Sequence, residues 1–262
     1  MNDTSIHLIY FSPTHTSEKI ARSIAKGTQC SHVTETDLTC DLSCEELNIE
    51  EQLALISVPV YGGRVAPTAL ERIHRLRGKE TAAIISVVYG NRDYEDALVE
   101  LRDTITGQGF NVISAGAFVG EHSYSRKEMP IAADRPDRSD LTRAEAFGKD
   151  SISKFAALSD SGIMPAFFIK GNTPYKEVAP PTPATPVTLE NQCTVCGNCL
   201  TLCPTDALFI NENGMIESDK MKCIKCCACV KECPSDARIF DTPYTALLHA
   251  NCAIPREPEL FF

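Results

Sequence analysis

Two copies of one cysteine motif stand 30 residues apart near the end of this 262-residue chain. Residues 193–207 and 223–237 both read Cys-x-x-Cys-x-x-Cys-x-x-x-Cys-Pro-x-Asp-Ala. Two residues between successive cysteines let one short loop wrap three thiolates around an inorganic cube. Zinc sites usually pair their cysteines across a longer gap. The doubled motif therefore predicts two [4Fe–4S] clusters rather than two zinc ions.

The motif resembles that of the bacterial-type two-cluster ferredoxins, in which the cysteine before the proline binds the other cluster. The resemblance implies a cluster one on Cys193, Cys196, Cys199 and Cys233, and a cluster two on Cys203, Cys223, Cys226 and Cys229. Cys227 interrupts the second copy where Gly197 stands in the first. We expect Cys227 to pack near cluster two, and a role as a substitute ligand is the alternative.

Composition excludes several other classes of protein. The formal net charge is −10, which argues against binding to nucleic acid, since phosphate contacts need a basic surface. No stretch is long and apolar enough for a membrane span, and no signal peptide is visible at the N-terminus. With eight of its 13 cysteines in the doubled motif, the chain is expected in a reducing cytoplasm.

Residues 1–160 alternate short apolar runs with amphipathic stretches. Strands are expected at 6–11, 53–60, 81–89 and 112–119, and helices at 16–26, 67–76, 93–106 and 142–158. Strands and helices that alternate at these lengths form βαβ units. The sequence therefore predicts an α/β domain, with a parallel sheet that carries helices on both faces.

The first expected strand is followed at once by a loop rich in hydroxyl groups, which leads into a helix. Its candidate ligand residues are Ser12, Thr14, His15, Thr16 and Ser17. Free N–H groups and the helix dipole attract an anion to such a position. Since the loop holds no Lys or Arg, we expect a phosphate bound by neutral donors. A simple helix N-cap is the alternative that this loop alone leaves open.

Two later strand ends each supply a tyrosine beside glycine. The candidate residues are Pro59, Val60, Tyr61, Gly62 and Gly63 in one loop, and Tyr89, Gly90, Asn91, Arg92 and Tyr94 in the other. In a doubly wound sheet, ligands bind at the carboxyl ends of the strands, beside the point where the strand order reverses. These loops therefore offer the flat wall and the N–H groups that an isoalloxazine ring needs.

Together the three loops resemble those of the flavodoxins, which bind FMN. This resemblance covers residues 5–160 and implies a flavodoxin-like, doubly wound parallel sheet of five strands in the order 2-1-3-4-5. Flavodoxins commonly have Gly where His15 stands, so the His15 ring is expected either to donate to the phosphate or to point into solvent. Residues 89–92 and 120–125 are similar to motifs of the flavodoxin–ferredoxin fusion proteins of anaerobic bacteria and archaea, a resemblance that spans essentially the whole chain.

We therefore expect four segments. They are a flavodoxin-like FMN-binding domain at 1–165, a Pro-rich linker at 166–188, a small α+β ferredoxin-like domain with two clusters at 189–242, and a C-terminal tail at 243–262. The linker is expected to be extended, either as a simple tether or as a belt along the first domain. The tail ends in Phe261 and Phe262, so we expect it to dock on the protein.

The cofactors predict electron transfer, because FMN takes two electrons and each cluster takes one. We expect low-potential electrons to move between the two clusters and FMN, and on to a redox protein partner, a ferredoxin-like donor or acceptor. The alternative is an FMN-dependent reductase of a small-molecule substrate. The long connection 121–140 is then a lid, with His122 and Tyr124 as candidate proton donors; otherwise it is a partner-docking surface. A homodimer is left open.

Overall fold

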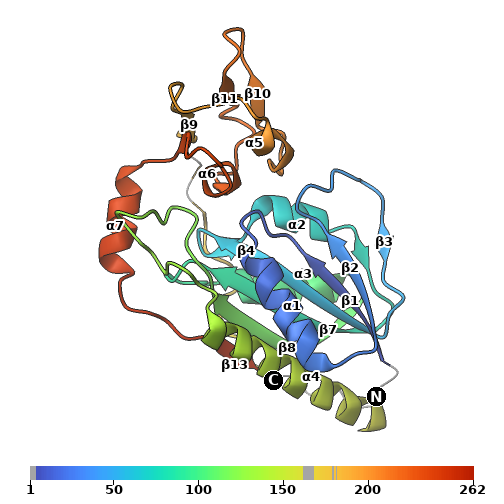
Figure 1. Ribbon diagram of the computed structural model, residues 1–262. Helices are drawn as coiled ribbons and strands as arrows, with labels where there is room; N and C mark the ends of the chain where they lie inside the picture. The colour runs from blue at the N-terminus through green and yellow to red at the C-terminus, as the bar shows by residue number, and fades with distance from the viewer. Residues whose placement is uncertain (1–3, 162–167, 179, 181) are drawn as a thin grey trace.

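A computed structural model describes residues 4–161, 168–178, 180 and 182–262. Its main sheet joins five parallel strands: β1 (Ser5–Tyr10), β2 (His32–Asp37), β4 (Leu53–Tyr61), β7 (Thr81–Tyr89) and β8 (Phe110–Val119). They lie in the order β2-β1-β4-β7-β8, with β13 (Glu259–Phe261) antiparallel at the β8 edge (Figure 1). Counting the five parallel strands along the chain gives 2-1-3-4-5, so the predicted flavodoxin-like topology is confirmed.

Helices cover both faces of this sheet. One face packs against α1 (Thr16–Thr28) and α4 (Arg138–Ser161), and the other against α2 (Pro67–Ile73) and α3 (Ala97–Gly107). Side chains of each strand alternate between the two cores, so that Leu53 and Leu55 face α1 while Ala54 and Ile56 face α3. Gly148 lets α4 approach α1, since a Cβ there would lie 2.0 Å from the carbonyl oxygen of Ile24.

Three helix boundaries differ from the sequence prediction. The helix expected at 93–106 begins at Ala97, because residues 93–96 turn at the end of β7. The helix expected at 67–76 ends at Ile73, and the chain then enters β6 (Leu76–Arg77), which pairs with β3 (Leu47–Asn48). The last helix is longer than expected at both ends. A short strand β5 (Arg64–Val65) folds back antiparallel onto β4.

The cysteine-rich segment forms a separate small α+β unit above the sheet (Figure 1). Its elements are β9 (Val187–Thr188), α5 (Asn198–Thr201), β10 (Leu208–Ile210), β11 (Ile216–Ser218), α6 (Ala228–Lys231) and β12 (Arg238–Ile239). β10 pairs with β11 around a turn at Gly214, which has φ 76°, and β12 pairs with β9. We refer to residues 187–242 as the dicluster unit.

The linker and the tail both lie along the first domain. Asp96 accepts hydrogen bonds from the backbone N–H groups of Asn172 and Lys176, each at 2.7 Å, so this part of the linker is a belt rather than a free tether. Residues 166, 167, 179 and 181 of the predicted linker lie outside the described residues. The tail forms α7 (Pro243–Asn251) and β13, and the Phe262 ring lies 5.4 Å from that of Phe147. The tail therefore packs against the first domain.

Within the described residues, no helix combines the length and apolar character that a membrane span requires.

Candidate functional site

Five cysteines from both repeats line one cavity in the dicluster unit. Four of them, Cys203, Cys223, Cys226 and Cys229, are the set that the ferredoxin resemblance assigns to cluster two, and the fifth is Cys227. Most of the remaining lining is apolar and includes Ile224 and Ala228. Burial raises the pKa of Cys226, and raises that of Cys229 to about 11. These thiols therefore need a cation to become thiolates at neutral pH, which is what binding to a metal centre supplies.

The cysteines assigned to cluster one also come together. Cys199 is buried, and burial raises its pKa, with further contributions from the neighbouring Cys233 and Cys196. The two exchanged cysteines have matching environments: Cys203 accepts a hydrogen bond from the N–H of Ala207 at 3.2 Å, and Cys233 accepts one from Ala237 at 3.3 Å. In the part of the chain that the structure describes, no group of three or more His, Cys, Asp or Glu side chains is placed so that it could hold a single metal ion.

The hydroxyl-rich loop at the start of α1 leaves polar groups free. His15 is the N-cap with φ 61°, and its side chain makes no capping bond. The N–H of Glu18 donates to the Ser12 hydroxyl, and the N–H of His15 donates to the Ser12 carbonyl. Helix geometry leaves the N–H groups of Thr16 and Ser17 without intrahelical partners. The Ser17 hydroxyl is also fully buried and has no hydrogen-bond partner among the residues that the structure describes. This donor set fits an anion, as a flavin phosphate requires.

The His15 ring lies at the surface, and its Nδ1 is 2.8 Å from a carboxylate oxygen of Glu18. The ring was expected either to donate to the phosphate or to point into solvent, and the structure shows it at the solvent-exposed surface.

The loop after β4 lies between the two parts of the molecule. Pro59 is buried, Val60 and Tyr61 are partly buried, and Gly62 and Gly63 turn the chain with φ values of 64° and 86°. Burial raises the pKa of Tyr61 well above its usual value, and its electrostatic neighbours include Cys226, Cys227 and Tyr124. The predicted flavin loop therefore lies next to the cysteines assigned to cluster two.

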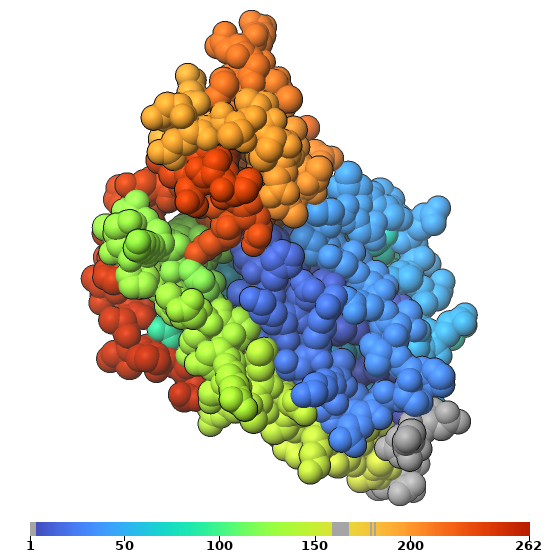
Figure 2. All heavy atoms as spheres, in the orientation of Figure 1, coloured from blue at the N-terminus to red at the C-terminus, as the bar shows by residue number. Residues whose placement is uncertain are grey.

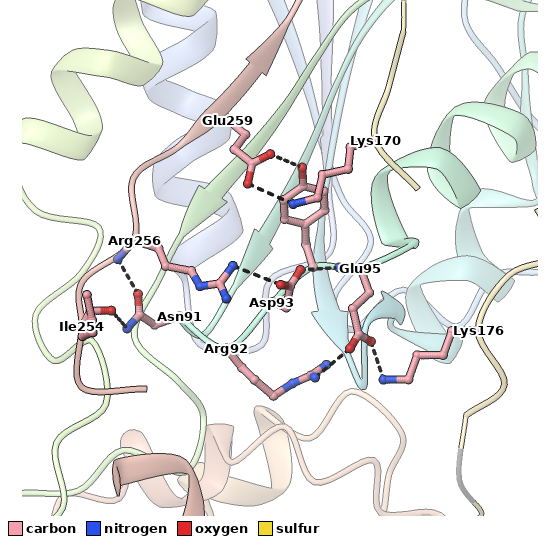
Figure 3. A network of polar contacts seen from close by, with 10 residues as sticks. Asn91, Arg92, Asp93, Glu95, Lys170, Lys176, Ile254, Arg256 and Glu259 are labelled. Atoms are coloured by element: carbon pink, nitrogen blue, oxygen red, sulfur yellow. Dashed lines mark hydrogen bonds and ion pairs between the residues drawn. The ribbon is translucent and has the colours of Figure 1, made fainter. Parts of the chain in front are cut away.

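The loop after β7 corrects part of the predicted flavin site. Asn91 donates to the carbonyl groups of Cys252 and Ile254, at 2.7 and 3.0 Å, and accepts from the N–H of Arg256 at 2.8 Å (Figure 3). The Tyr94 hydroxyl donates to Glu259 at 2.7 Å. Asn91 and Tyr94 thus hold the C-terminal tail, which sequence analysis expected to dock without identifying where.

Tyr89 is also turned away from solvent. Its ring is 98% buried and lies 5.5 Å from the Tyr94 ring. Two other residues of this loop were predicted to contact the flavin, Gly90 and Arg92. Gly90 packs beneath the His122 ring, and Arg92 pairs with Glu95 at 2.9 Å.

The connection after β8 contacts the dicluster unit. Lys231 of α6 donates to Glu121 at 2.5 Å and to the Ser125 carbonyl at 2.8 Å, and Arg126 pairs with Asp241 at 3.1 Å. In the space-filling view the green segment that contains this connection lies against the dicluster unit (Figure 2). The connection was expected to be a lid or a partner-docking surface; the structure instead shows it in contact with another part of the same chain.

His122 and Tyr124 lie within this contact. The Tyr124 ring is 5.1 Å from His122, 5.0 Å from Phe240 and 6.4 Å from Tyr244. Burial lowers the pKa of His122 to about 4, with smaller contributions from the positive charges of Arg92 and Lys231. Burial also raises the pKa of Tyr124. His122 is therefore neutral near pH 7, which does not suit a general acid.

Sequence analysis missed a buried arginine on the other side of the contact. Arg72 is 93% buried and donates to the carbonyl groups of Leu38, at 2.7 Å, and of Thr39 in the first domain. It also donates to the carbonyl of Pro204, next to Cys203. Sequence analysis did not single out Arg72, because the carbonyl groups that surround its guanidinium come from two distant segments.

Comparisons with known proteins give one family match and several similar structures. Residues 185–234 match the family described as a 4Fe-4S dicluster domain. Solved structures similar to the chain include a flavodoxin from Archaea (13% identity, 58% of this chain and 99% of that one, TM-score 0.40). They also include flavodoxin 1 from Bacillus cereus (11%, 57% and 98%, TM-score 0.41) and a Fusobacterium nucleatum flavodoxin bound to flavin mononucleotide (13%, 59% and 98%, TM-score 0.38). No curated protein matches the chain.

The strand order and the dicluster match define the class of protein. The chain joins a flavodoxin-like α/β domain to a segment that matches a 4Fe–4S dicluster domain, the arrangement that the resemblance to the flavodoxin–ferredoxin fusion proteins implies.

Proposed function

We propose that this protein carries electrons between two [4Fe–4S] clusters and FMN, and exchanges them with a separate redox protein. Cluster one is held by Cys193, Cys196, Cys199 and Cys233, and cluster two by Cys203, Cys223, Cys226 and Cys229. FMN lies at the carboxyl ends of β1, β4 and β7. Electrons pass between the partner protein and FMN through cluster one and then cluster two.

The observation that carries this proposal is the position of Tyr61. It belongs to a strand-end loop of the flavodoxin-like domain, and its neighbours include Cys226 and Cys227 of the second repeat. Ile224, from the loop that begins at Cys223, also packs against the main core of the first domain. A flavin in its usual place at this edge of the sheet is therefore adjacent to cluster two, while cluster one is farther out.

The free groups at the start of α1 support FMN as the flavin. The N–H groups of Thr16 and Ser17 and the buried Ser17 hydroxyl are neutral donors for a phosphate, with Ser12 and Thr14 beside them. Bound FMN supplies two-electron chemistry, and each cluster supplies a one-electron step. The residues of this chain bind the phosphate, hold the ring beside Tyr61, and exclude water from the contact with the dicluster unit.

The alternative function, an FMN-dependent reductase fed by the clusters, needs an open face for a small-molecule substrate. The two candidate proton donors lie where the dicluster unit and α7 pack, with Tyr124 against Phe240. This position favours a structural role in joining the two domains. A ferredoxin-like protein remains the proposed partner, and a homodimer stays a prediction.

Stopped-flow reduction under anoxic conditions tests the proposal. A reduced low-potential ferredoxin should bleach the flavin of the purified protein, whereas NADH alone should not. Cys203→Ser removes a ligand of cluster two and should abolish this bleaching while FMN stays bound. Cys44→Ser is the matched control, because Cys44 is exposed and belongs to neither cysteine set. Equal bleaching rates in Cys203→Ser and the parent protein would rule out the pathway.

A further inference from the structure

Arg238 is a buried cation in the dicluster unit with no acidic partner. It is 98% buried, and no carboxylate among the described residues forms an ion pair with it. Its guanidinium donates to the Thr188 hydroxyl at 2.6 Å, the Pro186 carbonyl at 3.0 Å and the Ser218 hydroxyl at 2.5 Å. All of these acceptors are neutral. A buried charge without a counter-ion is costly, so an anion is expected close to it.

The nearest sulfur to this cation belongs to a predicted cluster ligand. One guanidinium nitrogen, Nη2, lies 3.9 Å from the Sγ of Cys229. The Nε of Arg238 is buried and has no partner. Arg238 is also an electrostatic neighbour of Cys199 and Cys223, which belong to different cluster sets. The guanidinium therefore lies near both sets and contacts the set of cluster two directly.

The internal repeat shows that the cation is specific to one copy. Residue 238 follows the second motif at the position that Leu208 occupies after the first. Leu208 lines the cavity of Cys203 and Cys223, whereas Arg238 brings a fixed positive charge to Cys229. The motif's cysteine spacing needs no cation at this position, because the first copy does without one.

From this arrangement we infer that Arg238 is the internal counter-charge of the two clusters and makes cluster two the better electron acceptor. Net charge and hydrogen bonds to sulfur set the reduction potential of an iron–sulfur cluster. Each reduction adds one negative charge, so a nearby cation stabilises the reduced state. Since Arg238 contacts Cys229 directly, the effect is larger on cluster two, which lies next to the flavin domain. This inference rests on the proposed function.

Redox titration of the anoxic holo-protein, followed by electron paramagnetic resonance, tests the inference. Arg238→Gln keeps side-chain hydrogen bonding but removes the charge. It should make reduction of cluster two at least tenfold less favourable, about 59 mV for one electron, with a smaller change for cluster one. Arg238→Lys keeps a cation and should remain within threefold of the parent. Lys220→Met removes the same charge from an exposed position and should change neither cluster, because solvent screens it.

Each outcome of this experiment is decisive. Unchanged potentials in Arg238→Gln with both clusters present would overturn the inference and leave the proposed function intact. Loss of clusters from Arg238→Gln but not from Arg238→Lys would support a requirement for the charge. Loss of clusters from both variants would show that the side chain's shape, rather than its charge, is needed. A parent protein with zinc or without FMN would instead contradict the proposed function.

Discussion

The two cysteine repeats share one backbone and differ in what surrounds them. Positive φ values recur at Val195 and Lys225, and again at Asp206 and Asp236. In the first copy Cys196 is exposed, whereas its counterpart Cys226 is buried. The second copy also carries Cys227 in place of a glycine, at φ 61°. The backbone conformation of the cysteine loop is therefore the same in both repeats, whereas the burial of the loop and its surroundings differ.

This difference separates an outer from an inner cluster. The second repeat packs against Tyr61 and Glu121 of the first domain through Cys226 and Lys231. The first repeat faces solvent at Cys196 and contacts the first domain mainly through Pro204, which lies in its final loop. We expect each repeat to respond differently when the metal, the contact or the charge is changed.

Removal of all iron should have the largest effect, because a bound cluster is the feature that the two repeats have in common. Within residues 189–242, Ile216 and Phe240 are the only large apolar side chains that are buried, with exposed fractions of 3% and 9%, so the apo unit has little core. Hydrogen exchange should show residues 189–242 unprotected in the apo-protein and β1, β4 and β7 still protected. Retained protection in 189–242 would mean that the clusters are not needed for the fold of the unit.

Partial removal of iron should distinguish the two repeats. An iron chelator reaches an exposed loop more readily than a buried one, so cluster one should be lost roughly tenfold faster than cluster two. Native mass spectrometry during anoxic chelation should then detect a four-iron intermediate. Cys196→Ser should yield this four-iron form directly. Simultaneous loss of both clusters, with no intermediate, would contradict the distinction between outer and inner positions.

The contact of the second repeat should weaken on acidification. The pKa of His122 is lowered to about 4 in the folded protein, below the usual value of 6.5. The unfolded chain therefore binds a proton that the folded protein does not, and stability falls as pH drops from 6.5 toward 4. Between pH 6.5 and 5.5 the loss attributable to His122 is about 1 kcal/mol. Urea unfolding of His122→Gln, compared with the parent at both pH values, should lack this component of the pH dependence.

The smallest effect is expected from one ion pair. Lys231 of the second repeat binds Glu121, while Thr201 stands at the equivalent place in the first. Lys231→Met should cost about 1 kcal/mol in the free energy of unfolding, with a smaller cost at high salt. Lys220→Met removes the same charge from an exposed site and should be close to neutral. Equal costs for the two substitutions would show that the Lys231 contact is unimportant.

Sequence analysis predicted the parts of the structure that local patterns encode. Periodicity within residues 5–160 predicted a parallel sheet, and the flavodoxin resemblance implied its strand order. The cysteine sets were implied by the resemblance to two-cluster ferredoxins. The strand β2 was not located, because its sequence, HVTETD, is polar and mostly exposed at the sheet edge. Its only signal is parallel pairing with β1, which depends on residues distant in sequence.

The contacts between the two domains were beyond sequence analysis for the same reason. Asn91 was expected to face the flavin, but it binds the C-terminal tail, whose residues lie more than 160 positions away. From the sequence alone, Arg72 and Arg238 are indistinguishable from surface basic residues, because the carbonyl groups and thiols around them come from distant segments. The sequence gives the type of such a residue, whereas the fold determines which groups it contacts.

The central claim is that one chain holds a flavin and two four-iron clusters. Purification without oxygen, followed by iron, sulfide, zinc and flavin analysis of the same sample, tests it most directly. The account predicts one FMN together with about eight iron atoms and eight sulfides per chain. A sample with zinc in place of iron, with only four irons, or with no flavin would contradict it.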